Sequence, residues 1–134
     1  MIKIQKYAAV DIGSNAVRLL ICSVISQNNN IVEVKKISLV RVPIRLGLDG
    51  FLKNKIKTEN RNRLNDAMNA FKFLMKIHDV SKYKICATSA MREATNSKDV
   101  INEIHSNTGL QIDIISGKDE ASLIADTFFA NNFN

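Results

Sequence analysis

The stretch of sequence that decides the fold is YAAVDIGSNAVRLLICSV, residues 7–24. Two apolar runs rich in β-branched residues, Tyr7–Ile12 and Val17–Val24, flank the turn Gly13-Ser14-Asn15. Apolar runs separated by a short glycine-containing turn are typical of two antiparallel strands. The stretch therefore predicts a β-hairpin.

A third strand is predicted directly after the hairpin. Apolar residues recur with looser alternation from Ile31 to Val42, beyond the polar connector Gln27–Asn30. Pro43 should end this strand, because proline lacks the N–H that a sheet ladder requires. The first three strands are thus expected to form an antiparallel meander.

From Glu59 onward the apolar spacing changes to three and four residues, which predicts a helix as far as His78. Ser116-Gly117-Lys118-Asp119 has the Ser-x-x-acid form of a helix start and predicts a helix to about Ala130. Between these two helices the sequence predicts a strand at Lys84–Ala87, a helix from Asn96 through Ile104 that stops at Gly109, and a strand at Gln111–Ile115.

The expected order is βββαβαβα, an α/β fold. An antiparallel meander followed by βα crossovers makes a mixed five-stranded sheet with helices packed against it. The chain has 134 residues, which suits one domain over residues 1–134.

Composition narrows the classes of partner. The chain carries 19 Lys plus Arg against 13 Asp plus Glu, a net charge of +6, which favours an anionic partner. Nucleic acid is disfavoured because the basic residues are dispersed and tryptophan is absent. No apolar run approaches the roughly 18 residues that a membrane span needs, so we expect a cytoplasmic protein without a membrane partner.

The cysteines and histidines lack the spacing of a metal site. Cys22 and Cys86 lie inside apolar runs and are expected to be buried thiols. His78 and His105 are expected at the surface.

The hairpin turn carries candidate chemistry. Asp11 at a strand end, followed by Gly13-Ser14-Asn15, gathers backbone N–H groups and short polar side chains around one point, and such a turn can cradle a phosphate. From these residues alone, an ordinary hairpin turn explains the pattern equally well.

The longer string Asp11–Ile21 resembles the first phosphate loop of the exopolyphosphatase and guanosine pentaphosphate phosphatase family, in the actin-like ATPase superfamily. Three further stretches fit the family pattern in the right order: Arg45-Leu46-Gly47, Ala87–Asn96 and Ile114–Ala121. The resemblance covers Tyr7 to Ala130 and implies an actin-like, ribonuclease H-like lobe.

What the resemblance implies is Mg²⁺-dependent hydrolysis of the terminal phosphoanhydride of polyphosphate or of guanosine pentaphosphate. Glu120 matches the family's catalytic glutamate, which would orient and deprotonate the attacking water. Without the resemblance, the favoured explanation of Glu120 is an acid in the first turn of a helix, and only the resemblance reverses that preference. Asp11 is the candidate metal ligand. The expected phosphate-binding residues are Asp11, Gly13, Ser14, Asn15, Arg18, Arg45, Thr88, Ser89 and Arg92.

Several of these residues have a plainer alternative. Arg45 and Arg92 taken singly are more often solvated surface charges, and Ser89 is also explained as the cap of a short helical turn. Ser122 stands where the family usually carries arginine, which puts phosphate contacts at that edge in doubt.

The superfamily binds substrate between two lobes, and a second Gly-rich phosphate loop is expected after the last predicted helix. None follows before Asn134, so the chain is expected to be an N-terminal phosphate-binding lobe that works with a second lobe of the same protein. The full protein is also a candidate homodimer.

Two other functions compete with this one. The first is the nucleotide-binding lobe of an acetate or sugar kinase, which leaves Arg45-Leu46-Gly47 unexplained. The second is a non-catalytic module that binds polyphosphate or an alarmone.

Overall fold

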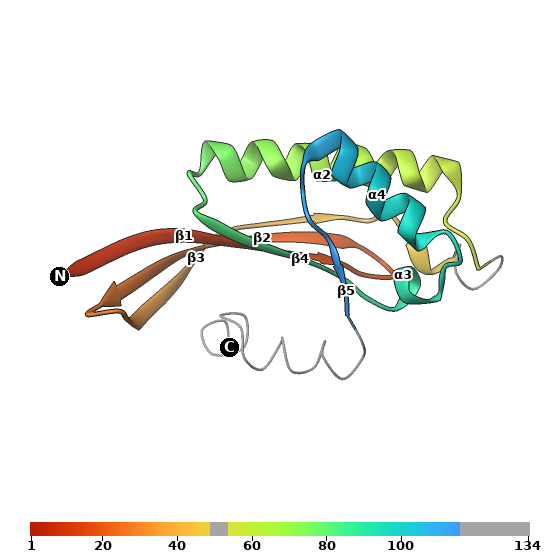
Figure 1. Ribbon diagram of the computed structural model, residues 1–134. Helices are drawn as coiled ribbons and strands as arrows, with labels where there is room; N and C mark the ends of the chain where they lie inside the picture. The colour runs from red at the N-terminus through yellow and green to blue at the C-terminus, as the bar shows by residue number, and fades with distance from the viewer. Residues whose placement is uncertain (49–53, 116–134) are drawn as a thin grey trace.

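The computed structural model describes residues 1–48 and 54–115. A single mixed sheet runs through the molecule with the strand order β3-β2-β1-β4-β5 (Figure 1). Its strands are β1 (Ile2–Ile12), β2 (Val17–Gln27), β3 (Asn30–Val42), β4 (Lys82–Ala87) and β5 (Asp113–Ile114). The predicted α/β fold with a mixed five-stranded sheet is confirmed.

The first three strands form the predicted meander, and both of its pairings are antiparallel. β1 begins at Ile2, five residues earlier than the sequence predicts, because it pairs with β2 along its whole length, from Ile12 opposite Val17 to Ile2 opposite Gln27. Lys3, Gln5 and Lys6 interrupt the apolar residues of this extension, so it does not belong to the continuous apolar run from which the strand is predicted. β3 ends at Val42, directly before Pro43, as predicted.

The crossovers are also confirmed. β4 pairs with β1 in parallel, and β5 pairs with β4 in parallel. Helix α2 (Thr58–Ile77) connects β3 to β4, and α4 (Ser97–Thr108) connects β4 to β5. Gly109 ends α4 with a φ of 77°, the left-handed conformation that glycine adopts without a steric penalty.

Both long helices lie on one face of the sheet, where they enclose the core (Figure 1). Alternate residues of β1 and β2 point toward them, since side chains in a strand alternate between the two faces. Buried residues in this core include Val10, Ile12, Leu19, Ile21, Leu64, Met68, Phe71, Val100 and Ile104. The opposite face carries a smaller buried cluster formed by Leu20, Cys22, Val24 and Val34.

A short helix, α3 (Ser89–Glu93), follows β4, where the sequence allowed a short helical turn. Two side chains differ from the sequence-based expectation. Cys22 is buried as predicted, but Cys86 is only half-buried, and both thiols are free. His105 is exposed as predicted, whereas His78 is half-buried at the end of α2.

The helix predicted from Ser116 to about Ala130 lies outside the described residues. None of the described helices is long and apolar enough to cross a bilayer.

Candidate functional site

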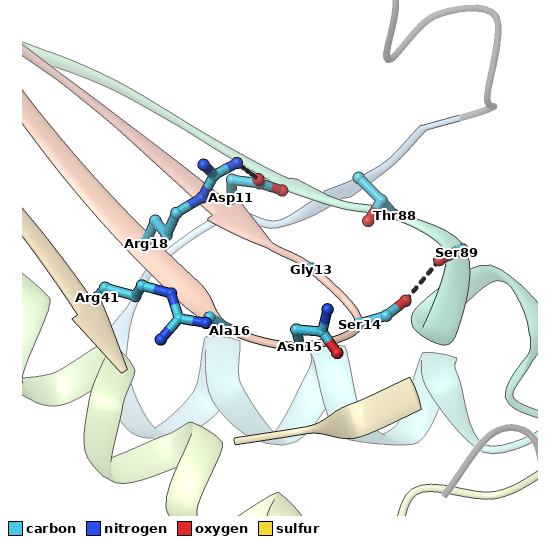
Figure 2. Close-up of a pocket in the computed structure, with 9 residues that line it drawn as sticks. All are labelled: Asp11, Gly13, Ser14, Asn15, Ala16, Arg18, Arg41, Thr88 and Ser89. Atoms are coloured by element: carbon cyan, nitrogen blue, oxygen red, sulfur yellow. Dashed lines mark hydrogen bonds and ion pairs between the residues drawn. The ribbon is translucent and has the colours of Figure 1, made fainter. Parts of the chain in front are cut away.

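An open pocket of about 390 Å³ lies at the end of the sheet where the β1–β2 turn meets the start of α3 (Figure 2). Three segments far apart in the sequence build it: the β1–β2 hairpin, the end of β3 and the β4–α3 junction. It is lined by Asp11, Gly13, Ser14, Asn15, Ala16, Arg18, Arg41, Thr88 and Ser89. Seven of the nine phosphate-binding residues expected from the sequence therefore share one pocket.

The β1–β2 turn forms the floor of the pocket. The N–H of Gly13 donates to the carbonyl of Ala16 over 3.0 Å, which closes the turn. Within the described part of the chain, the backbone N–H groups of Ser14, Asn15 and Ala16 have no acceptor. Unsatisfied amides in a tight turn are the usual means by which a backbone binds an anion.

The β4–α3 junction forms the wall facing this turn. The backbone N–H of Thr88 donates to the carbonyl of Ile12 over 3.1 Å, which continues the parallel pairing of β1 and β4 by one residue. The hydroxyls of Ser14 and Ser89 lie 2.6 Å apart and share a hydrogen bond, drawn as a dashed line in Figure 2. Ser89 is therefore not the helix cap that was its alternative role, because Thr88 occupies the N-cap position of α3.

Two arginines and one aspartate line the opposite side. Arg18 lies directly across from Asp11 on β2, and Arg41 lies directly across from Arg18 on β3. Because residues in register share a face, the three side chains project into the pocket in one row (Figure 2). Arg18 forms an ion pair with Asp11. Arg41 has no ion-pair partner among the described residues, so this side of the pocket carries a net positive charge.

The Asp11–Arg18 ion pair is a surface interaction. The side chains are 28% and 54% exposed respectively, and exposed ion pairs contribute at most about 1 kcal/mol to stability. The ion pair therefore adds little to stability, and its main effect is to hold a carboxylate and a guanidinium group beside the turn. An incoming anion can recruit Arg18 at little energetic cost.

Arg41 is the pocket residue that sequence reasoning missed. Counting back along the β2–β3 hairpin from the pair Gln27–Asn30 would set Leu39 opposite Arg18. Two register shifts, between Ile21 and Cys22 and between Ile25 and Ser26, bring Arg41 there instead. A β-bulge inserts an extra residue without a clear sequence signal, so only the paired strands reveal the position.

Two predicted arginines lie outside the pocket lining. Arg45 is exposed, and its contact with the hairpin turn is made by its backbone N–H, which donates to Asn15 over 3.0 Å. The guanidinium of Arg92 donates to the carbonyl of Ile115, tying α3 to the chain after β5. Glu120, the predicted catalytic residue, lies outside the described residues.

A Mg²⁺ ion accompanying a phosphate would find one carboxylate in the pocket lining. The described residues contain no cluster of three or more histidine, cysteine or acidic side chains, so they do not form an all-protein metal cage. Asp11 is the carboxylate that lines the pocket. Mg²⁺ is commonly held by one or two carboxylates together with substrate phosphates and water, an arrangement that Asp11 fits.

Cys86 neighbours Asp11 in the sheet and also lies opposite Asp113 of β5. Burial raises the pKa of the Cys86 thiol; Lys84 lowers it, and Asp113 and Asp11 add to the increase. Its surroundings in the sheet therefore favour the neutral thiol.

Comparison with known proteins identifies the chain's relatives. The Ppx/GppA phosphatase family model matches residues 24–133, well over half of the chain. The bifunctional 3-dehydroquinate synthase/phosphatase of Fusobacterium nucleatum is 34% identical over 116 residues, which cover 85% of this chain and 18% of that protein.

Solved structures agree in fold. The Ppx/GppA family member of Aquifex aeolicus superimposes with a TM-score of 0.80 at 23% identity, covering 88% of this chain and 37% of that one. An exopolyphosphatase from Cytophaga hutchinsonii gives 0.78 at 26% identity, covering 89% and 36%. This chain thus spans little more than a third of their length, and its actin-like, ribonuclease H-like fold is theirs. The chain belongs to the Ppx/GppA phosphatase family.

Proposed function

We propose that this chain is the N-terminal phosphate-binding lobe of an exopolyphosphatase-type phosphohydrolase. The complete protein would release terminal orthophosphate from polyphosphate or guanosine pentaphosphate by metal-assisted attack of water. The observation that carries the proposal is the pocket in which a Gly13-Ser14-Asn15 turn with unsatisfied amides lies beside Arg18 and Arg41. Fixed hydrogen-bond donors and cations are the main requirements of phosphoryl transfer.

The two sides of the pocket would bind different phosphates of the substrate. The amides of the turn and the hydroxyls of Ser14 and Thr88 would bind the terminal phosphate. Arg18 and Arg41 would hold the phosphates that follow, since guanidinium groups form paired hydrogen bonds with phosphate oxygens. Mg²⁺, when bound, neutralises phosphate charge, and Asp11 is its proposed ligand from this lobe.

Glu120 is the proposed general base. Its support is the match of Ile114–Ala121 to the family pattern. A carboxylate in this role orients the attacking water and accepts its proton. The second lobe is proposed to supply the opposing phosphate loop, and the solved relatives, about two and a half times as long as this chain, support that expectation.

Turnover tests the proposal directly. In the protein that joins this lobe to a second one, Glu120→Gln should lower kcat for orthophosphate release about a hundredfold or more, since a general base contributes about 10² to 10⁴ in rate. Affinity for polyphosphate should stay within about twofold, because the amide preserves the shape of the carboxylate. The 134-residue chain alone should bind polyphosphate and release little orthophosphate.

Asp99→Asn, a change in the first turn of α4, is a matched control for loss of one carboxylate and should leave kcat unchanged. Unchanged turnover in Glu120→Gln would assign that residue to helix stabilisation alone. Binding without turnover in the joined protein would favour the non-catalytic polyphosphate module.

A further inference from the structure

The segment that follows β3 is fixed in the core by alternate residues. Ile44 and Leu46 are 1% and 0% exposed. Between and after them, Arg45 and Gly47 direct their backbone N–H groups toward the β1–β2 turn. Arg45 donates to the carbonyl of Asn15 over 3.0 Å, and Gly47 donates to that of Ser14 over 2.8 Å.

These two hydrogen bonds constrain the direction of the next two amides. In a planar trans peptide, the carbonyl of one residue and the N–H of the next point in opposite directions. The Ser14 carbonyl faces Gly47, so the N–H of Asn15 points away from Gly47. By the same argument, the N–H of Ala16 points away from Arg45. Asn15 and Ala16 line the pocket, and neither amide has an acceptor within the described residues.

We infer that Arg45-Leu46-Gly47 acts as a backbone brace: it orients two peptide groups of the turn so that the amides of Asn15 and Ala16 donate to a bound phosphate. Gly47 is the main positioning residue of the brace. The inference rests on the proposed function, in which the turn binds phosphate. It replaces the guanidinium contact expected from Arg45 with a role for its main chain.

The residue types fit this role. A Cβ atom at Gly47 would lie 3.0 Å from the Cβ of Ser14 and 3.2 Å from its carbonyl oxygen, so a side chain there crowds Ser14 and requires the turn to give by a few tenths of an ångström. Arg45 has a φ of 62°, in the left-handed region that favours glycine. A side chain at position 45 is therefore not needed for the hydrogen bond, and glycine there should form it with less strain.

The test follows tripolyphosphate binding to the ¹⁵N-labelled protein by NMR. In the wild type, the amides of Asn15 and Ala16 should shift on titration. Gly47→Ala should weaken binding at least about tenfold, or about 1.4 kcal/mol, and reduce both shifts. Arg45→Gly should bind within about twofold of the wild type.

Gly109→Ala is the matched control. Gly109 has a positive φ, of 77°, and a Cβ there meets nothing within 4 Å, so alanine strains the backbone far from the turn. This variant should lose stability and keep wild-type affinity. A loss of affinity in Gly109→Ala equal to that in Gly47→Ala would overturn the brace, because general destabilisation would then explain both.

A second measurement needs no variant. Because binding and brace are coupled, saturating tripolyphosphate should slow hydrogen exchange of the Gly47 amide in the wild type. Unchanged exchange would overturn the inference, as would an equal loss of affinity in Arg45→Gly and Gly47→Ala. Absence of any shift at Asn15 and Ala16 in the wild type would instead contradict phosphate binding by the turn, and with it the proposed function.

Discussion

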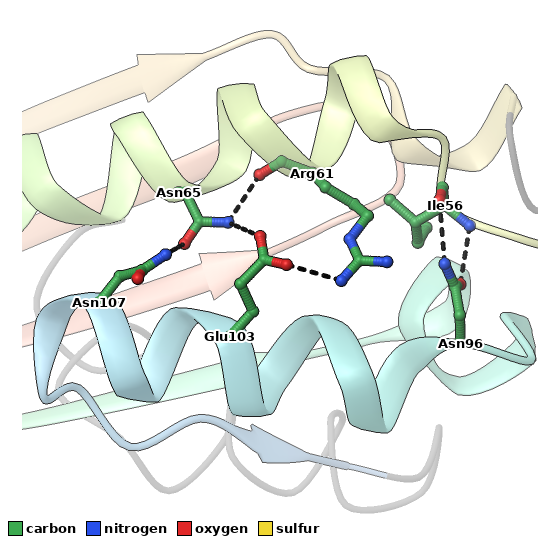
Figure 3. Close-up of polar contacts among 6 residues, drawn as sticks. All are labelled: Ile56, Arg61, Asn65, Asn96, Glu103 and Asn107. Carbon is green, nitrogen blue, oxygen red and sulfur yellow. Dashed lines mark hydrogen bonds and ion pairs between the residues drawn. The ribbon is translucent and has the colours of Figure 1, made fainter.

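The side chain of Asn96 joins the chain before α2 to the start of α4 (Figure 3). Its Oδ1 accepts from the backbone N–H of Ile56 over 2.9 Å, and its Nδ2 donates to the carbonyl of Ile56 over 3.0 Å. Asn96 is 8% exposed and Ile56 is 1% exposed. One amide side chain thus satisfies both backbone groups of a buried residue.

Asn96→Ala should lower the free energy of unfolding by about 3 kcal/mol. Each buried backbone group that loses its partner costs about 1–3 kcal/mol, and two are lost here. Partial entry of water at the slightly exposed edge keeps the expected value in the lower half of the summed range of about 2 to 6 kcal/mol. Urea unfolding monitored by circular dichroism measures the change.

Asn107→Ala is the control, because this exposed residue donates one hydrogen bond, to the side chain of Asn65, so only one acceptor loses its partner and the cost should be about 1 kcal/mol, the lower end of the range for one group. If Asn96→Ala costs no more than this control, the reasoning about the paired hydrogen bonds is wrong.

A second variant adds a pH signature. Asn96→Asp keeps the acceptor but turns an oxygen toward the Ile56 carbonyl, and protonation restores a donor there. The folded variant therefore holds this proton more tightly than the unfolded chain. Its stability should approach that of the wild type at about pH 4 and decline as pH rises toward about 7. A deficit that does not change with pH would count against this geometry.

Three further outcomes are expected. Arg41→Ala should weaken tripolyphosphate binding and flatten its dependence on salt, whereas Arg45→Ala should change neither; equal effects in titrations at several ionic strengths would make both arginines ordinary surface charges. Burial raises the pKa of the Cys22 thiol from 9.0 to about 11, although the charge of Lys36 lowers it. The contribution of the neutral thiol to stability should therefore be present below about pH 9 and be lost as pH rises to about 11. Alkylation at pH 8 should correspondingly modify Cys22 more slowly in the folded protein than in urea; equal rates would contradict burial of the thiol.

The sequence by itself determined the order of the described strands and long helices, and the turn that forms the floor of the pocket. Alternating apolar residues and the Gly13-Ser14-Asn15 turn are local signals, and each specifies a hairpin whatever the rest of the chain does. The change to helical spacing after Glu59 and the glycine that ends α4 are equally local. The strand-end position of Asp11 and the hydroxyls after β4 likewise place candidate ligands at one edge of a sheet once the strand order is inferred.

Only the tertiary structure decided which side chains meet in the pocket. Arg41 reaches it because two register shifts move β3 along β2, and register depends on how whole strands pair. The hydrogen bond between Ser14 and Ser89 joins residues 75 positions apart. Arg45 and Gly47 match the sequence pattern of the family. The contacts they make with the turn are nevertheless formed by their backbone N–H groups. Local sequence sets periodicity and turn type, whereas contacts between distant segments follow from packing of the complete sheet, which no short window of sequence encodes.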